Sequence, residues 1–247
     1  MKLTILGSGT AAPLLERSNA AYLLEIENKK LLFDSGAGTI RRLLELKINL
    51  FEIDHIFYTH LHNDHINDLG AIIWSNNYGG KRLRPLTLYG PKGLKEYCNI
   101  LIKKLLKPAK LKFKLHITEL KNSNLKIGNI GVKTQAIKHS PTTKSIAYRI
   151  GYKNKTFVYT GDTEYCNETI KIAKNAHFLM TECSFSDKAE GHLTPKLAGK
   201  IASKANAKTL VLTHFYPEVL KADIKKICGK EFKGNIILAK DKLKVNL

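Results

Sequence analysis

The stretch HLHNDH, residues 60–65, places four metal-capable side chains within six positions. It follows the apolar run His55–Thr59, which predicts a buried strand. Side chains at positions i and i+2 of a strand end point the same way, so His60 and His62 can converge on one point. A helical turn after them would present the last two side chains to a neighbouring point. The stretch therefore predicts a site for two divalent cations about 3.5–4 Å apart, in preference to a polar loop of solvated histidines.

Length and composition are those of a globular protein with a substantial core. The apolar fraction is 43% and no repeat or linker divides the chain, so we predict that residues 1–247 form a single domain. No run approaches the roughly 18 apolar residues that a membrane span needs, and we expect no membrane partner. A strand pattern begins at once after Met1, and the four cysteines include no CxxC pair. Both features favour free thiols in the cytoplasm.

The charge of the chain is strongly positive. Lys and Arg number 41 against 21 Asp and Glu, which gives a net charge of +20. Such a balance favours polyanionic partners, because each neutralised phosphate releases condensed counterions. A lysine-rich genome or a high growth temperature explains the same composition equally well. The charge alone therefore does not establish nucleic-acid binding, and the sequence leaves both a monomer and a homodimer open.

Strand-like and helical patterns are distributed over both halves of the chain. Short apolar or alternating runs predict strands over Leu3–Leu6, Ala21–Ile26, Lys30–Phe33, His55–Thr59, Leu86–Tyr89, Lys112–Glu119, Ile130–Ile137, Ser145–Ile150, Thr156–Tyr159, Phe178–Glu182, Thr209–Thr213 and Ile236–Leu238. Helical patterns cover Thr39–Leu46, Asp64–Trp74, Lys92–Leu106, Glu164–Ala173, Pro195–Ala205 and Pro217–Ile227. Strands mostly follow one another, which favours two packed sheets with helices outside over a regular parallel βαβ array.

A second set of metal-capable side chains lies at the ends of other predicted strands. His139, Asp162 and His214 each come just after a strand-like run. Glu182 ends another such run, and His192 lies on the loop beyond it. Each of them taken singly has an ordinary explanation as a loop or capping residue. Six of the nine histidines fall in such places, however, and that concentration favours a metal site.

Together these segments resemble the metallo-β-lactamase superfamily over nearly the whole chain. Residues 60–65 match its HxHxDH motif, and Leu6–Thr10, Leu32–Gly36, Thr160–Thr163 and Leu212–His214 match further motifs. The resemblance implies an α+β fold, an αββα sandwich of two mixed sheets with helices on the outer faces and the site at one sheet edge. It also implies that His60, His62 and His139 hold one metal, that Asp64, His65 and His214 hold the other, and that Asp162 bridges the two.

The resemblance implies two divalent ions as cofactors. Zinc is the first choice, and Mn²⁺ or Fe²⁺ would also accept these ligands. Such a pair lowers the pKa of a bridging water, so that hydroxide attacks an amide, a thioester or a phosphodiester near neutral pH. Aspartate in place of cysteine at the bridging position 162 is similar to the phosphodiesterase and thioesterase branches and speaks against a β-lactamase.

The segments around Glu182 and His192 are similar to paired motifs of the ribonuclease Z group. In that group a glutamate orients a histidine beside the scissile phosphate. Glu182 would hold the imidazolium form of His192 and raise its pKa, which makes the histidine a competent general acid. An alkoxide leaving group needs that proton, whereas a thiolate scarcely does. The alternative is that His192 and Thr194 only cap the helix that starts at Pro195.

One departure from ribonuclease Z concerns RNA binding. Those enzymes usually carry a long arm that grips tRNA, but here Tyr152 leads through 153–155 directly into the next strand at Thr156. The lysine-rich stretch 103–114 offers an alternative basic surface. It is more typical of a solvated helix end followed by an edge strand that lysines protect from aggregation.

We therefore expect a dinuclear metal-dependent phosphodiesterase that acts on RNA or on a small or cyclic phosphodiester. Asp64 would be both a ligand and the group that orients the nucleophile, and Glu182 with His192 would protonate the leaving oxygen. One alternative is a thioesterase or other acyl hydrolase, similar to glyoxalase II or a lactonase, with the same metals. Another is a nucleic-acid-binding module that has lost catalysis, against which the complete ligand set argues.

Overall fold

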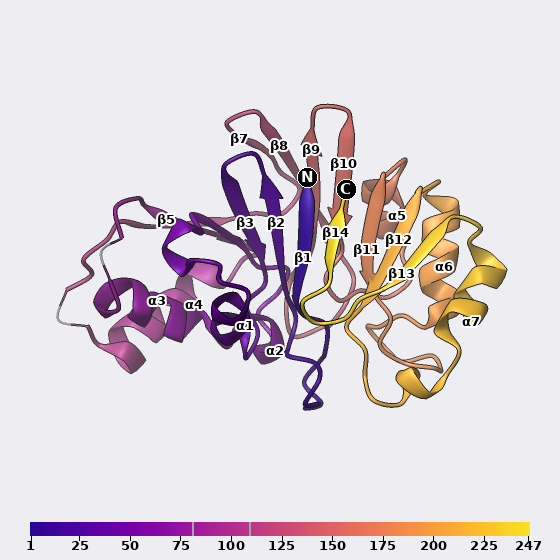
Figure 1. The fold of residues 1–247 in the computed structure, drawn as a ribbon, viewed down its shortest axis with the longest axis horizontal. Helices are drawn as coiled ribbons and strands as arrows, with labels where there is room; N and C mark the ends of the chain where they lie inside the picture. The colour runs from indigo at the N-terminus through magenta and orange to yellow at the C-terminus, as the bar shows by residue number, and fades with distance from the viewer. Residues whose placement is uncertain (81, 109) are drawn as a thin grey trace.

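Two seven-stranded sheets form the centre of the molecule (Figure 1). The computed structural model describes residues 1–80, 82–108 and 110–247. The first sheet has the order β14-β1-β2-β3-β4-β5-β6. Its strands are β1 Lys2–Gly7, β2 Ala21–Ile26, β3 Lys29–Phe33, β4 His55–Phe57, β5 Leu86–Gly90, β6 Leu115–Glu119 and β14 Lys244–Asn246.

The second sheet repeats this plan with the later part of the chain. Its order is β13-β12-β11-β10-β9-β8-β7. The strands are β7 Asn124–Ile127, β8 Ile130–Ile137, β9 Ser145–Tyr152, β10 Lys155–Tyr159, β11 Phe178–Glu182, β12 Thr209–Thr213 and β13 Asn235–Leu238. Each sheet is antiparallel in one half and parallel in the other, because short hairpins join some neighbours and helical crossovers join the rest.

Helices cover the outer faces of both sheets. Those beside the first sheet are α1 Thr39–Glu45, α2 Asn63–Ile66, α3 Leu69–Tyr78 and α4 Leu94–Ile100, followed by a π-helical turn over Leu101–Leu106. Those beside the second are α5 Asn167–Ala173, α6 Pro195–Lys204 and α7 Ile224–Glu231. Two 3₁₀ turns, Leu50–Glu52 and Val219–Lys221, complete the elements. The predicted α+β sandwich of two mixed sheets is confirmed.

Aromatic side chains fill the space between the two sheets. The Phe33 ring of β3 stacks on Phe57 of β4 at 5.1 Å between centroids. It meets Tyr148 and Phe157 of the other sheet edge-on at 5.7 and 5.9 Å. All four side chains are fully buried, and burial of such a side chain contributes about 1.5–3 kcal/mol. This core holds the two sheets together beneath the edge that carries the site.

The predicted helix Asp64–Trp74 is wrong in one respect, because the structure divides it into α2 and α3. Asp68 lies at the break, where its backbone N–H donates to the Ser35 carbonyl at 2.9 Å. Its carboxylate accepts from the Ile40 N–H at 3.0 Å. These contacts tie the break to the loop after β3, and they turn α2 so that His65 points inward.

Two other predicted elements begin later in the structure than the sequence suggested. The strand expected over Lys112–Glu119 begins only at Leu115, and the helix expected over Pro217–Ile227 starts at Ile224 after a 3₁₀ turn. Strands β7 and β14 were not predicted, since both are short, polar edge strands with little apolar pattern. No helix in the described segments 1–80, 82–108 and 110–247 is long and apolar enough to cross a membrane.

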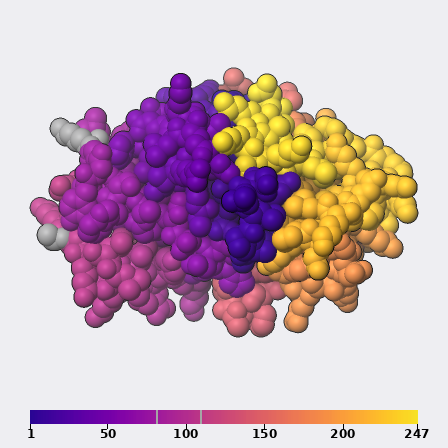
Figure 2. All heavy atoms as spheres, turned by 60° about the horizontal axis from the view of Figure 1, so that its bottom comes forward, coloured from indigo at the N-terminus to yellow at the C-terminus, as the bar shows by residue number. Residues whose placement is uncertain are grey.

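The segment after β1 and the segment before β14 are tied together at the edge that carries the site. The Asp241 carboxylate accepts hydrogen bonds from the backbone N–H groups of Ser8 at 2.9 Å and Ser18 at 2.7 Å. It also pairs with Arg42 of α1 at 3.1 Å. In Figure 2 the indigo N-terminal segment accordingly lies between the purple first half and the yellow C-terminal part. Asp241 thereby fixes both ends of the loop 8–18.

Candidate metal centre

The predicted site residues follow strands that end at the same edge of the sandwich. Residues 60–65 come just after β4, and His139 comes just after β8. Asp162 follows β10, Glu182 ends β11 and His214 directly follows β12. Strands β8, β10, β11 and β12 run in the same direction, so their carboxyl ends meet. Segments far apart in the sequence therefore deliver polar side chains to one place.

The structure brings His60, His62 and His139 together as the first predicted triad. Their ligand atoms lie within 4.8 Å of one another. The His139 Nε2 atom lies 3.1 Å from His62 Nδ1. The His60 ring is fully buried, and its Nε2 atom has no hydrogen-bond partner among residues 1–80, 82–108 and 110–247. Three imidazole nitrogens thus converge on one point.

The second predicted triad, Asp64, His65 and His214, is also assembled. The Nε2 atoms of His65 and His214 face each other at 3.1 Å. Asp64 Oδ2 lies 3.3 Å from His214 Nε2 and 3.9 Å from His65 Nε2. Burial alone would raise the pKa of Asp64. The hydrogen bond with His214 and the charges of His65 and His214 outweigh burial and lower this pKa to about 2. Asp64 therefore stays ionised at neutral pH.

Asp162 lies between the two triads. Its Oδ2 atom is 3.4 Å from the Nε2 atoms of both His65 and His214 and 3.9 Å from that of His60. Its Oδ1 atom is buried and has no hydrogen-bond partner in the described part of the chain. Gly161 makes this approach possible: its φ is +62°, and a Cβ there would lie 2.5 Å from the Thr59 side chain.

Four of the five predicted ligand histidines are held from behind by a second hydrogen bond. The Nδ1 partners are Thr59 Oγ1 for His60 at 3.1 Å, Asp34 Oδ2 for His65 at 2.9 Å, the Gly191 carbonyl for His139 at 2.8 Å and Ser184 Oγ for His214 at 3.0 Å. A carbonyl or carboxylate can only accept, so Nδ1 of His139 and of His65 carries the proton. The front Nε2 atoms then present lone pairs to the site, the arrangement typical of metal-ligating histidines.

This donor set fits divalent cations. Two lone pairs that face each other at 3.1 Å repel unless positive charge lies between or beside them. Burial and neighbouring His65 hold the pKa of His60 well below its usual value, so its lone pair stays available. Burial also opposes protonation of His65, but Asp162 and Asp34 outweigh it and raise the His65 pKa. The site thus favours a positive charge at its centre, and imidazoles with carboxylates suit borderline-soft ions.

Asp34 is the main site residue that the sequence did not single out for a role. It lies directly after β3, fully buried, with a φ of +55°. Besides His65, its carboxylate accepts from the Thr59 N–H at 2.8 Å and the Tyr159 hydroxyl at 2.8 Å. The signal was present, since Asp34 follows a strand as the predicted ligands do. Its carboxylate lies one layer behind them and orients His65.

Replacing Asp34 by asparagine is expected to weaken metal binding about 10- to 100-fold, because an amide does not hold the His65 tautomer as a carboxylate does. Competition with a chromogenic chelator measures the affinity. Glu96→Gln, at an exposed position on α4, removes the same charge and should leave the affinity as it is. An unchanged affinity in Asp34→Asn would show that the carboxylate does not position His65.

Glu182 and His192 form the predicted pair. The His192 Nδ1 atom lies 3.1 Å from each Glu182 carboxylate oxygen, and Glu182 also accepts from the Thr163 N–H at 2.7 Å. Burial opposes the charge of His192, but the hydrogen bond and the charge of Glu182 outweigh it and raise the His192 pKa to about 9. The helix α6 is capped by Thr194 alone, whose Oγ1 accepts from Leu197. The capping alternative is therefore wrong for His192.

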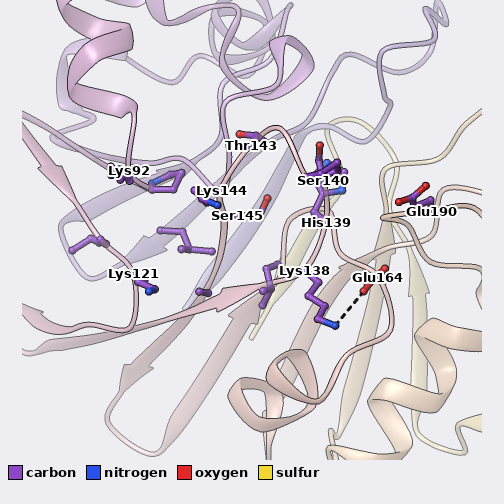
Figure 3. Close-up of a pocket in the computed structure, with 16 residues that line it drawn as sticks. Lys92, Lys121, Lys138, His139, Ser140, Thr143, Lys144, Ser145, Glu164 and Glu190 are labelled. Carbon is purple, nitrogen blue, oxygen red and sulfur yellow. Dashed lines mark ion pairs between the residues drawn. The ribbon is translucent and has the colours of Figure 1, made fainter.

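Two cavities open beside these residues. One, of about 460 Å³, is lined by His62, Asp64, Asp162, His192 and Tyr216. The other, of about 630 Å³, has His139 among its lining residues. Figure 3 shows this second cavity, a basic groove that we define by its four lysines, Lys92, Lys121, Lys138 and Lys144. Of these, Lys138 lies 3.9 Å from Glu164.

Known proteins are similar to this chain over most of its length. Residues 1–233 match the family model described as Anti-Pycsar protein Apyc1. Ribonuclease BN of Proteus mirabilis (strain HI4320) is 27% identical, with 87% of this chain and 88% of that protein covered. Ribonuclease Z of Methanosarcina mazei is 25% identical over 100% of this chain and 98% of that protein.

Solved structures agree on the fold. The metallo-β-lactamase fold protein YhfI from Bacillus subtilis superposes with a TM-score of 0.86 at 24% identity, covering 99% of this chain and 98% of that one. The short form of human tRNase Z gives a TM-score of 0.80 at 24% identity, covering 100% and 99%. The chain therefore belongs to the family described as Anti-Pycsar protein Apyc1 and is a ribonuclease Z-like member of the metallo-β-lactamase superfamily.

Proposed function

We propose that this protein is a metal-dependent phosphodiesterase. The observation that carries the proposal is the Glu182–His192 pair, which stands within reach of the assembled ligand triads: His192 shares a 4.8 Å cluster with His139 and Asp162. The relatives named ribonuclease Z and ribonuclease BN support the same class of reaction. A solved neighbour described as a diphosphatase of the PhnP family shares the fold, with a TM-score of 0.77.

Seven residues would hold the metals. One divalent ion would be bound by His60, His62 and His139, a second by Asp64, His65 and His214, and Asp162 would be shared by both. We propose zinc first, with Mn²⁺ and Fe²⁺ as alternatives that the same ligands accept. When bound, such ions supply an activated water near neutral pH and neutralise charge on the phosphoryl oxygens.

The protein's own residues would orient the nucleophile and protonate the leaving group. The Asp64 carboxylate, ionised and partly exposed to the cavity, accepts a hydrogen bond from the attacking water and thereby orients it. His192, with a pKa of about 9, is protonated at neutral pH and can donate its Nε2 proton to the departing alkoxide. Glu182 holds the ring through Nδ1, which leaves Nε2 free for that transfer.

The pair favours a phosphodiester over an acyl substrate. A sugar alkoxide is a poor leaving group and needs a proton, whereas a thiolate leaves without one. A catalyst for thioesters would gain little from a buried carboxylate that keeps a histidine charged. A thioesterase or other acyl hydrolase remains the alternative, and a nucleic-acid-binding module without catalysis is a third.

Two observations point to different diesters. Only Lys153 and Asn154 separate β9 from β10, so no arm for tRNA is inserted there, and this favours a small or cyclic diester. The basic groove favours RNA, because among the described residues no carboxylate lies within 4.0 Å of the ammonium groups of Lys92, Lys121 or Lys144. A cytoplasmic location and a homodimer stay predictions.

One set of parallel assays tests the proposal. Purified protein is analysed for metal and then offered bis-aryl phosphodiester, a 2′,3′-cyclic nucleotide, precursor tRNA and an acyl-glutathione. We expect turnover of one or more diesters and none of the thioester. Turnover of the thioester alone would establish the acyl hydrolase, and no turnover after metal addition would favour the binding module.

Charge reversal in the basic groove tests the RNA alternative. If a strand crosses the groove, Lys92→Glu and Lys121→Glu should each weaken RNA binding and reduce the slope of log affinity against log salt by about 1. Fluorescence anisotropy of a labelled oligonucleotide at several salt concentrations measures both. The control is Lys225→Glu, which makes the same charge change at an exposed position on α7, remote from the groove in sequence and fold. Equal losses of RNA affinity in all three variants would show that the effect comes from the overall charge of the protein and not from the groove.

A further inference from the structure

Two aromatic side chains at the metal centre have no part in the chemistry described so far. Tyr216 lines the cavity of about 460 Å³ together with His62, Asp64 and His192. Phe185 lies against the Tyr216 ring at 4.6 Å between centroids and 22° between planes. The two rings come from different loops, one after β11 and one after β12. Their stack is therefore built by the fold and is not a local feature of one segment.

The stack stands beside the position of the leaving group. Tyr216 meets the rings of His214 and His192 edge-on, at 6.2 and 6.4 Å. Phe185 meets His192 edge-on at 5.3 Å. Because Phe185 covers one face of the Tyr216 ring, the part that lines the cavity belongs to its other face and its edges.

We propose that Tyr216, backed by Phe185, is the platform on which the nucleobase of a nucleotide substrate stacks. The inference rests on the proposed phosphodiesterase activity and assigns two residues to the part of its site that would hold a base, whether the substrate is cyclic or part of a strand. A cavity of about 460 Å³ lies within the range of small-ligand sites, roughly 300–1,000 Å³. Every base has a π-face, so an aromatic platform accepts all four with little preference.

The competing explanation is that the two rings only pack against His192 and hold it in place. That role and base stacking have different consequences. A packing role affects proton donation, and hence kcat for substrates with poor leaving groups. Stacking affects the affinity of any ligand that carries a base, including one that undergoes no reaction.

The test compares two products that differ only in the base. Binding of a nucleoside 5′-monophosphate and of ribose 5-phosphate to the metal-loaded protein is measured by calorimetry, and inhibition of bis-aryl phosphodiester hydrolysis is measured in parallel. We expect the base to tighten binding about tenfold or more in the wild type. Tyr216→Leu and Phe185→Leu should bring the ratio of the two dissociation constants close to one. Tyr216→Phe keeps the ring and should keep the ratio.

Tyr78→Leu, at a half-exposed aromatic position on α3, is the matched control and should retain the wild-type ratio. A wild-type ratio near one overturns the proposal, and so does an undiminished ratio in Tyr216→Leu, even if its kcat falls. Failure of the phosphodiesterase proposal is seen separately, as absence of diester hydrolysis by the wild type. The calorimetric ratio does not depend on that hydrolysis.

Discussion

Replacing Asp162 by asparagine is expected to lower diester hydrolysis about a thousandfold or more and to reduce the bound metal. One carboxylate oxygen of Asp162 lies 3.4 Å from both His65 and His214 and 3.9 Å from His60, so this residue reaches ligands of both triads. An amide lacks the charge that two cations would share. Metal ions contribute several kcal/mol to such reactions, and each 1.36 kcal/mol is about a tenfold change in rate.

Turnover of bis-aryl phosphodiester and metal content per chain are the two measurements. Asp187→Asn, at an exposed position, removes the same charge and should retain both values. Circular dichroism of the Asp162→Asn variant establishes that it has folded. An Asp162→Asn protein that keeps its full metal content and its rate would contradict the shared-ligand role.

Replacing His192 by alanine is expected to separate substrates by their leaving group. With a diester whose leaving group is a sugar or alkyl alkoxide, the rate should fall about 10²- to 10⁴-fold, the usual contribution of a general acid. With an activated aryl diester the loss should be much smaller, because an aryloxide departs without a proton. Steady-state kinetics on the two substrates measures the difference.

His116→Ala is the matched control, since His116 is exposed on β6 and bonds to none of the site residues. Glu182→Gln should behave like His192→Ala, because Glu182 holds the imidazole through its Nδ1 atom. If both kinds of substrate lose activity equally in the His192 variant, the general-acid role fails. The histidine would then act on binding or on the fold.

The sequence was sufficient for the fold class and for the location of the candidate ligands. Short, mainly apolar runs such as Ala21–Ile26 and Thr209–Thr213 coincide with strands of the structure because a central strand is buried over most of its length. Ligand-type side chains directly after such runs converge because parallel strands end at one edge. Helix boundaries were less accurate, as at Asp68, where a tertiary hydrogen bond with Ser35 overrides a continuous helical pattern.

The layer behind the ligands could not be predicted in the same way. The Gly191 carbonyl orients His139, and Ser184 orients His214, across sequence separations of 52 and 30 residues. A backbone carbonyl or a single serine has no chemical signature in a sequence. Only the packing of the two sheets shows which of many such groups lies behind a histidine ring. Stacking of Phe185 on Tyr216 is hidden for the same reason.

The tie made by Asp241 has a consequence for synthesis of the protein. The loop that this carboxylate fixes runs past Ala11 and, with Asn19 next to it, forms one wall of the cavity at Asp64. The ligand His214 also depends on that loop, since the Phe215 N–H donates to the Ser8 carbonyl at 3.1 Å. A growing chain therefore cannot complete its catalytic cavity until residue 241 has left the ribosome. Nascent chains shorter than this should lack the tie, and the wall of the cavity beside Asp64 should stay unfixed in them.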